Sequence, residues 1–334
     1  MRPDTTFTAA DFSSEYFKPE VLEKIRQKQY LNIWVPASLG GLDLSLTDGI
    51  ETLYKLAKTD GSLGWFVTLC SGANFFLRNL PQNVAKTLFD QNKTCFGGSG
   101  MIGGTAEKQG DSYIINGRWK YATGAPFLTH FTLNAQLSVD GVLQTDSEGQ
   151  PVFRSFILNA GDVEILETWR TMGLKATASH DFQVSNVLLP AERSFLYNEF
   201  YGDDSLDKIP FMIFAGLTLI ANYIGIAANF AELALEFKDH PTIRLFAEKV
   251  GQKHQRLQQN TNIIESHLNN NIPISEQFIA EFHEESTATV TDLLSGIMQI
   301  YPLLGIKAAN EDNKLNRCVR DFLTATQHSH FCPK

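Results

Sequence analysis

The stretch TWRTMGLKATASHDFQVSNVLLP, residues 168–190, decides the fold. Its second half alternates apolar and polar side chains over residues 181–188, with Phe182 and Val184 on the same side. A period of two predicts a half-buried strand. Pro190 cannot donate a ladder hydrogen bond, so the strand is predicted to end there.

The first half of this stretch places small hydroxyl side chains behind a large aromatic one. Trp169 is followed by Thr177, Ser179 and His180 within a short, glycine-containing segment. Hydroxyl groups that are buried without a hydrogen-bond partner cost free energy. The pattern therefore raises the question of what these hydroxyls face.

The same period of two extends over residues 95–190. SYIINGRWKYATG places Asn116-Gly117 between alternating apolar runs, a pattern that predicts a β-hairpin turn at these two residues. HFTLNAQL, VFRSFIL and VEIL follow as further strand-like runs. Five or six strands in about a hundred residues predict a small β-barrel or sandwich.

Helical patterns lie on both sides of this region. Pro19 is placed near the start of one helix, and Thr47 is the predicted N-cap of another, with Gly61 as its predicted stop. After Asp207, an apolar stripe at three- and four-residue steps predicts a long helix, and a seven-residue repeat predicts the next. The repeat consists of Ile243, Val250, Leu257 and Ile264.

Two more helices complete the C-terminal part. Ser275 is a candidate N-cap for the third, and the fourth runs from about Asn310 towards Gln327. Long helices with short connections are typical of an antiparallel bundle. The predicted fold is an N-terminal helical domain (1–92), a central small β-barrel or sandwich (93–200) and a C-terminal four-helix bundle (201–334).

Composition narrows the function classes. The net charge is −9, and no basic run is present to displace counterions from a nucleic acid. The four cysteines show no CxxC spacing and are predicted to be reduced thiols. The first residues show no apolar secretory signal, which predicts a cytoplasmic protein. The apolar run 211–230 is long enough to span a membrane, but a buried core helix explains the same residues and is the preferred interpretation.

Three further motifs give weaker signals. GGSGMIGG, residues 97–104, lacks the spacing of a phosphate-binding loop and predicts a close backbone approach, to another strand or to a ligand ring. The cysteines and histidines of residues 318–332 match no familiar metal-ligand spacing, so no metal site is predicted. The carboxylates of FHEES, residues 282–286, are interpreted as a solvated helix face.

Three segments together resemble the acyl-CoA dehydrogenase superfamily. WVPASLGGLDLSLTDGIETLYKLAKTDGSLGW resembles its VPxxxGG element and the following helix ending in DGSxxW. NGRWKYATGA resembles the hairpin along the flavin, and TWRTMGLKATASHDFQVSNVLLP resembles the W-x-x-x-G-x-x-x-T-x-S strand. The order of helical, β and helical regions also matches, so the resemblance covers most of the chain.

The resemblance implies a flavin, FAD or FMN, between the β-domain and the bundle. A flavin needs hydrogen-bond partners at its pyrimidine edge and apolar contacts on its ring, and the protein tunes its reactivity. The residues that the resemblance places at the flavin are Tyr121, Ala122, Thr123, Gly124, Trp169, Thr177 and Ser179. This would answer the question of what the hydroxyls face.

Departures from the dehydrogenase pattern favour another branch. The T-E-P-x-x-G-S-D loop, the Y-E-G-T base tetrapeptide and the R-x-x-F-G motif have no match in this chain. GGTAE, GRWKYATG and the terminal RDFLTATQH instead resemble flavin-dependent monooxygenases. In that branch a bundle histidine, corresponding to His328, can assist a flavin hydroperoxide and is the expected catalytic residue.

The expected function is a flavin-dependent oxidoreductase that uses reduced flavin and oxygen on a small organic substrate. Its expected partners are a separate flavin reductase and further copies of the chain, as a homodimer or homotetramer, with no nucleic acid and no membrane. Two alternatives stay open: an acyl-CoA dehydrogenase with an unrecognised base, and a flavin-free binding or scaffold protein. Flavin binding would exclude the scaffold protein.

Overall fold

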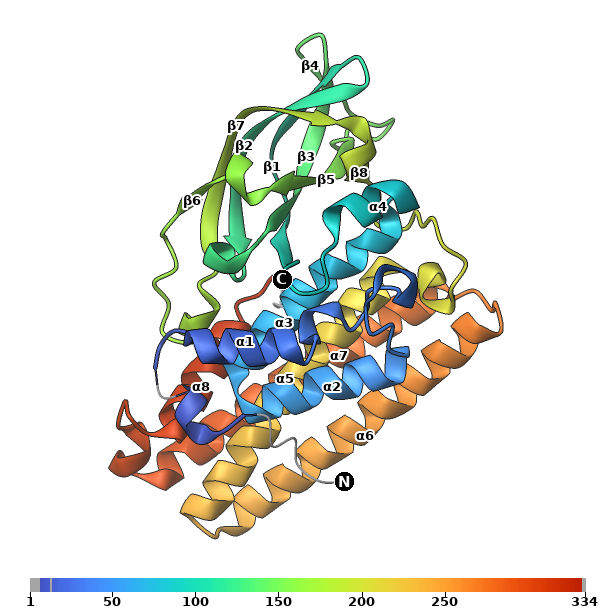
Figure 1. The fold of residues 1–334 in the computed structure, drawn as a ribbon. Coiled ribbons are helices and arrows are strands. Elements are labelled where there is room, and N and C mark those ends of the chain that lie inside the picture. Colours follow the sequence, from blue (N-terminus) through green and yellow to red (C-terminus); the bar gives the residue numbers. More distant parts are fainter. Residues whose placement is uncertain (1–6, 13, 332–334) are drawn as a thin grey trace.

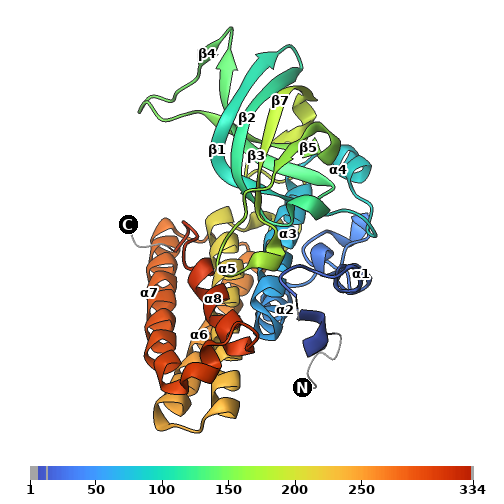
Figure 2. The same cartoon turned by 90° about the vertical axis from the view of Figure 1, so that its left-hand side faces the viewer.

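The computed structural model describes residues 7–12 and 14–331 of the chain. Helices lie at both ends of the sequence and a β-sheet lies between them (Figure 1). In space, the sheet forms one end of the molecule and the two sets of helices pack together below it (Figure 2). The fold is thus mixed α and β. The domain boundaries near residues 92 and 200 stay a prediction.

In the part of the chain that the structure describes, four α-helices precede the sheet: α1 (Pro19–Gln27), α2 (Leu46–Thr59), α3 (Gly61–Asn74) and α4 (Gln82–Leu88). Pro19 begins α1 as predicted. The cap of α2 was wrongly predicted, because Ser45 and not Thr47 accepts the first helical N–H, from Asp48. The Thr47 hydroxyl instead donates to Glu265 of the later helix α6 (Pro241–Asn269), and it lies 3.1 Å from Asn262 Oδ1.

Asp60 separates α2 from α3. Its carboxylate accepts the Leu63 N–H at 3.0 Å and so caps α3. Gly61, the predicted stop of α2, is therefore the first residue of α3. The two helices share this corner and nearly all of α3 is buried.

The described strands form one eight-stranded sheet with the order β6-β7-β2-β1-β3-β5-β8, and β4 pairs with β3. The pair β1/β3 is parallel and the other pairs are antiparallel. The strands are β1 (Phe96–Gln109), β2 (Ser112–Ala122), β3 (His130–Val139), β4 (Val142–Leu143), β5 (Phe153–Asn159), β6 (Glu164–Leu166), β7 (His180–Pro190) and β8 (Ser194–Phe195). The predicted strand at residues 181–188 is confirmed as β7, and it ends at Pro190.

The hairpin predicted at Asn116-Gly117 is wrong. β1 and β2 turn at Gly110, while Asn116 and Gly117 lie inside β2, where its register with β7 shifts. Gly117 faces Gly104 of β1, and a Cβ on either would come within 2.8 Å of the Trp119 ring. The glycine is therefore required for close packing over a buried indole and not for a turn.

The glycine-rich segment 97–104 lies in β1 and approaches its neighbouring strands closely. A Cβ at Gly98 would lie 1.7 Å from the Thr132 carbonyl oxygen of β3. A Cβ at Gly103 would lie 2.5 Å from the Arg118 carbonyl oxygen of β2. The close approach that the sequence predicts at these two glycines is to other strands.

Up to residue 331, four α-helices follow the sheet: α5 (Phe211–Phe237), α6, α7 (Glu276–Ile300) and α8 (Lys314–Ala325). Ser275 caps α7 as predicted, accepting the Phe278 N–H at 3.1 Å. The four heptad residues of α6 are all buried. By length and hydropathy, α5 could cross a membrane, but 83% of its most apolar window is buried inside the protein. Within the described fold, α5 is therefore the central core helix that the sequence favours.

A buried arginine ties the N-terminal helices to the segment before α5. The Arg78 side chain is 1% exposed and donates from Nη1 to Asp207 at 2.9 Å and Asp204 at 3.1 Å. Its Nη2 pairs with Asp43, and its Nε donates to the Trp34 carbonyl oxygen at 2.8 Å. One guanidinium thus joins three separate chain segments.

Helix α3 connects the sheet to the C-terminal helices. It packs against β1 and the 3₁₀ turn Lys175–Thr177 on one side, and against α5 and α8 on the other. Figure 2 shows it at the junction between the sheet and the helices. The residues predicted to hold a cofactor lie at this junction.

Candidate functional site

Three predicted hydroxyl residues form one buried chain of hydrogen bonds. Thr123, Ser179 and Thr177 are each at most 6% exposed. The Thr123 and Ser179 oxygens are 3.0 Å apart, and the Ser179 and Thr177 oxygens are 2.8 Å apart. The chain ends where the Thr177 hydroxyl donates to the Leu174 carbonyl oxygen at 2.7 Å.

The hydrogen bond from Thr177 to Leu174 determines which hydroxyl is the donor in each of the other two hydrogen bonds. Thr177 uses its only hydroxyl hydrogen on Leu174, so Ser179 must donate to Thr177 and Thr123 must donate to Ser179. The Thr123 oxygen then keeps its acceptor lone pairs available. The backbone reinforces the arrangement, since the Gly124 N–H donates to the Thr177 carbonyl oxygen at 2.7 Å.

Two aromatic side chains lie beside the hydroxyls. The rings of Tyr121 and Trp169 meet edge to face, with centroids 5.5 Å apart. Tyr121 is 51% exposed, whereas the intervening Ala122 is buried. The Trp169 indole N–H donates to the Leu174 carbonyl oxygen at 3.0 Å, so Trp169 and Thr177 share one acceptor.

Apolar side chains of β1 are exposed near Tyr121. Met101 and Ile102 are 62% and 40% exposed, at a bulge of β1. The Ser99 hydroxyl donates to the Lys120 carbonyl oxygen, which links this bulge to the residue before Tyr121. Exposed apolar groups around buried hydroxyls suit a ligand with an apolar face and a polar edge.

His328, the predicted catalytic residue, lies just beyond α8. Its ring meets the indole of Trp65 in α3 edge to face, at 5.6 Å between centroids. Burial lowers the pKa of His328, so the ring is neutral near pH 7. Its Nδ1 accepts the His330 N–H at 3.3 Å, which leaves the hydrogen on Nε2. His328 is therefore placed to donate a hydrogen bond.

Helix α3 lies between the histidine and the hydroxyl chain. A Cβ on Gly124, whose φ is +76°, would lie 2.5 Å from the Phe66 ring. The Cys70 thiol reaches the Thr123 carbonyl oxygen at 3.6 Å. The structure thus joins six of the seven predicted cofactor residues through hydrogen bonds and ring contacts, with Ala122 between two of them. His328 contacts α3 rather than these residues.

Two of the weaker motifs lie in or beside the C-terminal helices α7 and α8. No group of three or more His, Cys, Asp or Glu able to hold a metal occurs among residues 7–12 and 14–331, and Cys332 lies outside the described residues. In FHEES, Glu285 pairs with Arg256 of α6 at 2.6 Å, and Glu284 is exposed. These carboxylates lie on the outer face of the bundle.

One contact of the site could not be read from the sequence. Asp321 of α8, which is 3% exposed, accepts the Leu174 N–H at 2.6 Å. Its position in the RDFLTATQH motif was the available signal, but that motif directs attention to the histidine.

The residues at the junction fit a flavin: Tyr121 and Trp169 offer ring contacts, and Thr123 retains a free acceptor position.

The known proteins that resemble this chain are mostly flavin-dependent monooxygenases, and a putative acyl-CoA dehydrogenase of Bacillus subtilis is 28% identical over 200 residues, 54% of this chain. No family model matches the chain. Indole-3-acetate monooxygenase of Acinetobacter baumannii is 28% identical over 228 residues, 66% of this chain. The oxygenase component of the FADH2-dependent resorcinol hydroxylase of a Rhizobium species is 24% identical over 210 residues, 59% of this chain. The matches cover 56% and 50% of those proteins, so the chain spans about half the length of the curated relatives it matches.

The fold comparison extends over nearly the whole chain. The crystal structure of the HsaA monooxygenase from M. tuberculosis superimposes with a TM-score of 0.87 and 20% sequence identity. The match covers 96% of this chain and 88% of that one. The arrangement of helices, sheet and helices is therefore shared with that enzyme.

Proposed function

We propose that this chain, which has the acyl-CoA dehydrogenase-like fold of flavin-dependent monooxygenases, is the oxygenase component of such an enzyme. It would take up reduced flavin and oxygen and transfer one oxygen atom to a small organic substrate, while the second oxygen atom leaves as water and the flavin is released oxidised. The observation that carries the proposal is the buried chain Thr123–Ser179–Thr177 beside the Tyr121–Trp169 ring pair.

The residues of the site would have different roles in flavin binding and proton donation. Tyr121 and Trp169 would contact the flavin ring, and Thr123 would accept a hydrogen bond from the polar edge of that ring. The hydrogen bonds through Ser179 to Thr177 would orient the Thr123 hydroxyl. A bound reduced flavin supplies the electrons that activate oxygen. His328 would hold a proton on Nε2 for donation, and the Trp65 ring limits its orientation.

Cofactor and partners follow from the same proposal. FAD is the proposed flavin, with FMN as the alternative, and a separate reductase would supply it in reduced form. The substrate would be a small organic molecule. We propose a cytoplasmic protein that assembles as a homodimer or homotetramer.

The purified protein tests the proposal directly. Anaerobic titration with reduced FAD and FMN, followed by the flavin absorption spectrum, should show saturable binding of one of them. Oxygen added to the complex of protein and reduced flavin should then be consumed. Absence of binding by either flavin would favour the scaffold protein, and bleaching of bound oxidised flavin by acyl-CoA thioesters would favour the dehydrogenase.

Thr123→Val should weaken flavin binding about tenfold. The substitution keeps the side-chain volume but removes both the donor to Ser179 and the acceptor available to the flavin. Loss of one buried hydrogen bond costs about 1–3 kcal/mol, which corresponds to about tenfold or more in Kd. Thr291→Val on the exposed face of α7 is the matched control. Equal flavin affinity in the two variants would place Thr123 in the core only.

His328→Ala should raise the rate of hydrogen peroxide release about tenfold when the reduced flavin complex meets oxygen without substrate. Positioned acid-base groups contribute roughly 10²–10⁴-fold to rates, and His328 is neutral with a hydrogen to donate. His267→Ala, which replaces a histidine in the last turn of α6, is the control. A peroxide rate unchanged from the native protein would remove His328 from the proposed chemistry.

A further inference from the structure

Leu174 has a backbone conformation that side-chain-bearing residues rarely adopt. Its φ is +50° and its ψ is +31°, and Ala178 four residues later is also left-handed, with φ +43°. Such residues persist only where their surroundings hold them. Between these two residues lies the 3₁₀ turn Lys175–Thr177, so the left-handed pair shapes the loop that carries the proposed flavin contacts.

Both the backbone N–H and the carbonyl oxygen of Leu174 form hydrogen bonds. Its N–H donates to Asp321 Oδ1 at 2.6 Å, and its carbonyl oxygen accepts from Trp169 Nε1 and from Thr177 Oγ1. The neighbouring Arg320 donates from Nη1 to the Met172 carbonyl oxygen at 2.8 Å. Helix α8 therefore fixes two successive parts of the loop.

We propose that Asp321 is a positioning residue that sets the conformation of loop 169–179 through Leu174, and thereby the orientation of Trp169 and Thr177. This inference rests on the proposed function only in identifying the loop as a flavin pocket. The link from carboxylate to loop is a property of the protein without flavin. Asp321 accepts its hydrogen bond from Leu174, which is not one of the predicted cofactor residues, so it would act through one backbone unit.

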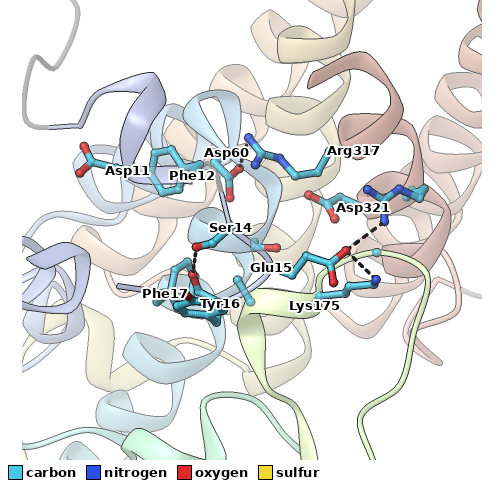
Figure 3. A pocket seen from close by; sticks show the side chains of 14 residues that line it. Asp11, Phe12, Ser14, Glu15, Tyr16, Phe17, Asp60, Lys175, Arg317 and Asp321 are labelled. Atoms are coloured by element: carbon cyan, nitrogen blue, oxygen red, sulfur yellow. Dashed lines mark hydrogen bonds and ion pairs between the residues drawn. The ribbon is translucent and has the colours of Figure 1, made fainter. Parts of the chain in front are cut away.

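The carboxylate lies in a mixed-charge environment between α8 and the start of α3. It borders a cavity of about 20 Å³, enough for a single water (Figure 3). The titratable and charged groups that face this region are Asp60 at the α3 N-terminus, Arg317, Cys318 and Arg320 of α8, Lys175 of the loop, and Asp11, Glu15 and Tyr16 of the N-terminal segment. Arg317 lies 3.5 Å from Asp60, and Glu15 pairs with Lys175 at 2.6 Å.

The contact should respond to pH near neutrality. Burial, and then repulsion from Asp60, raise the pKa of Asp321 to about 7. Because the folded pKa lies above the unfolded value of about 3.9, the stabilising contribution of the protonated form is lost as pH rises through about 7. Ionisation also makes Asp321 a stronger acceptor for the Leu174 N–H. Overall stability and local loop order should thus change in opposite directions.

Hydrogen–deuterium exchange of the flavin-free protein tests the positioning role. In Asp321→Ala, the Leu174 amide should exchange at least tenfold faster than in the native protein, with no comparable change in α6 or β3. Asp146→Ala is the matched control, because Asp146 also accepts backbone N–H groups, from Glu148 and Gln150 at 2.9 Å, but lies in the segment between β4 and β5. Exchange of Leu174 at the native rate, or an equal acceleration throughout the protein, would overturn the proposal.

Asp321→Asn separates the acceptor from the charge. The asparagine oxygen can still accept from Leu174, so loop protection at pH 6 should be close to native. Between pH 6 and 8, the protection of the Leu174 amide, corrected for its intrinsic exchange rate, should rise in the native protein and stay constant in the variant. Over the same pH range, the Tm of the native protein should fall more than the Tm of the variant. Parallel pH profiles in the two proteins would contradict the role assigned to the Asp321 charge.

Flavin titration then connects the loop to the site. Asp321→Ala should raise the flavin Kd about tenfold, and Asp321→Asn should leave it within about threefold at pH 6. If native protein binds no flavin, the proposed function fails while the exchange result still decides the positioning role. If native protein binds flavin and Asp321→Ala binds equally well, the positioning proposal fails alone.

Discussion

Replacing Arg78 with methionine is expected to lower the free energy of unfolding by about 3–5 kcal/mol, the cost of breaking a buried ion pair. Arg78 is 1% exposed, and its partner Asp207 is 3% exposed, 2.9 Å from Nη1. Methionine fills much of the volume but leaves that carboxylate buried without its cation. The Trp34 carbonyl oxygen would also lose its donor. Urea denaturation followed by tryptophan fluorescence measures the loss.

Arg244→Met is the matched control. Arg244 pairs with Asp239 at 2.5 Å, but both side chains are more than half exposed. Exposed ion pairs contribute little because water and salt screen them. The double variant Arg78→Met with Asp207→Asn should recover part of the loss, since it removes the unpaired charge. Arg78→Met as stable as Arg244→Met would show that the network does not hold the segments together.

Gly173→Ala is expected to weaken flavin binding by about 30–100-fold, which corresponds to about 2–3 kcal/mol of strain. A Cβ at this position would lie 2.1 Å from the Arg320 carbonyl oxygen and 2.5 Å from the Asp321 backbone nitrogen. Both are helical backbone atoms that cannot move aside. The loop must then withdraw from α8, which breaks the contact between Leu174 and the Asp321 carboxylate.

Gly161→Ala provides the control for this substitution. Gly161 lies in a short 3₁₀ turn after β5, and nothing lies within 4 Å of its added Cβ. Flavin titration and thermal denaturation of both variants separate an effect on the loop from a loss of the whole fold. Tight flavin binding by Gly173→Ala would mean that the site does not depend on how the loop lies against α8.

Features that depend on neighbours in sequence were predictable. The alternation over residues 181–188 is a strand, the Ser275 hydroxyl caps α7, and the seven-residue repeat of α6 is its buried face. Each of these depends on the period of one element or on one cap. Two failures were local, since the cap of α2 is Ser45 and not Thr47, and Gly61 begins α3. The failed hairpin depends on partners outside its own dipeptide. Asn116-Gly117 has the composition of a turn, but Gly104 and Trp119 determine its place within a strand.

In the candidate site, too, contacts between residues close in sequence were predictable and contacts between distant residues were not. Thr177 and Ser179 stand two residues apart, and the short motif that contains both is enough to indicate a shared role. The contact between Asp321 and Leu174 joins residues 147 positions apart, and no local pattern encodes it. The left-handed conformation of Leu174 was equally hidden, because leucine gives no signal of positive φ.

The position of α3 has a consequence for how the protein can be altered. Phe66 and Cys70 contact the sheet side of the site, while Trp65 contacts His328 on the bundle side. An α-helix advances 1.5 Å and turns about 100° per residue. Substitutions along α3 can therefore reshape the space between the two sides gradually. A single residue inserted between Trp65 and Phe66 would rotate the residues on the sheet side by about 100° relative to those on the bundle side. Variants of this helix should therefore keep its length.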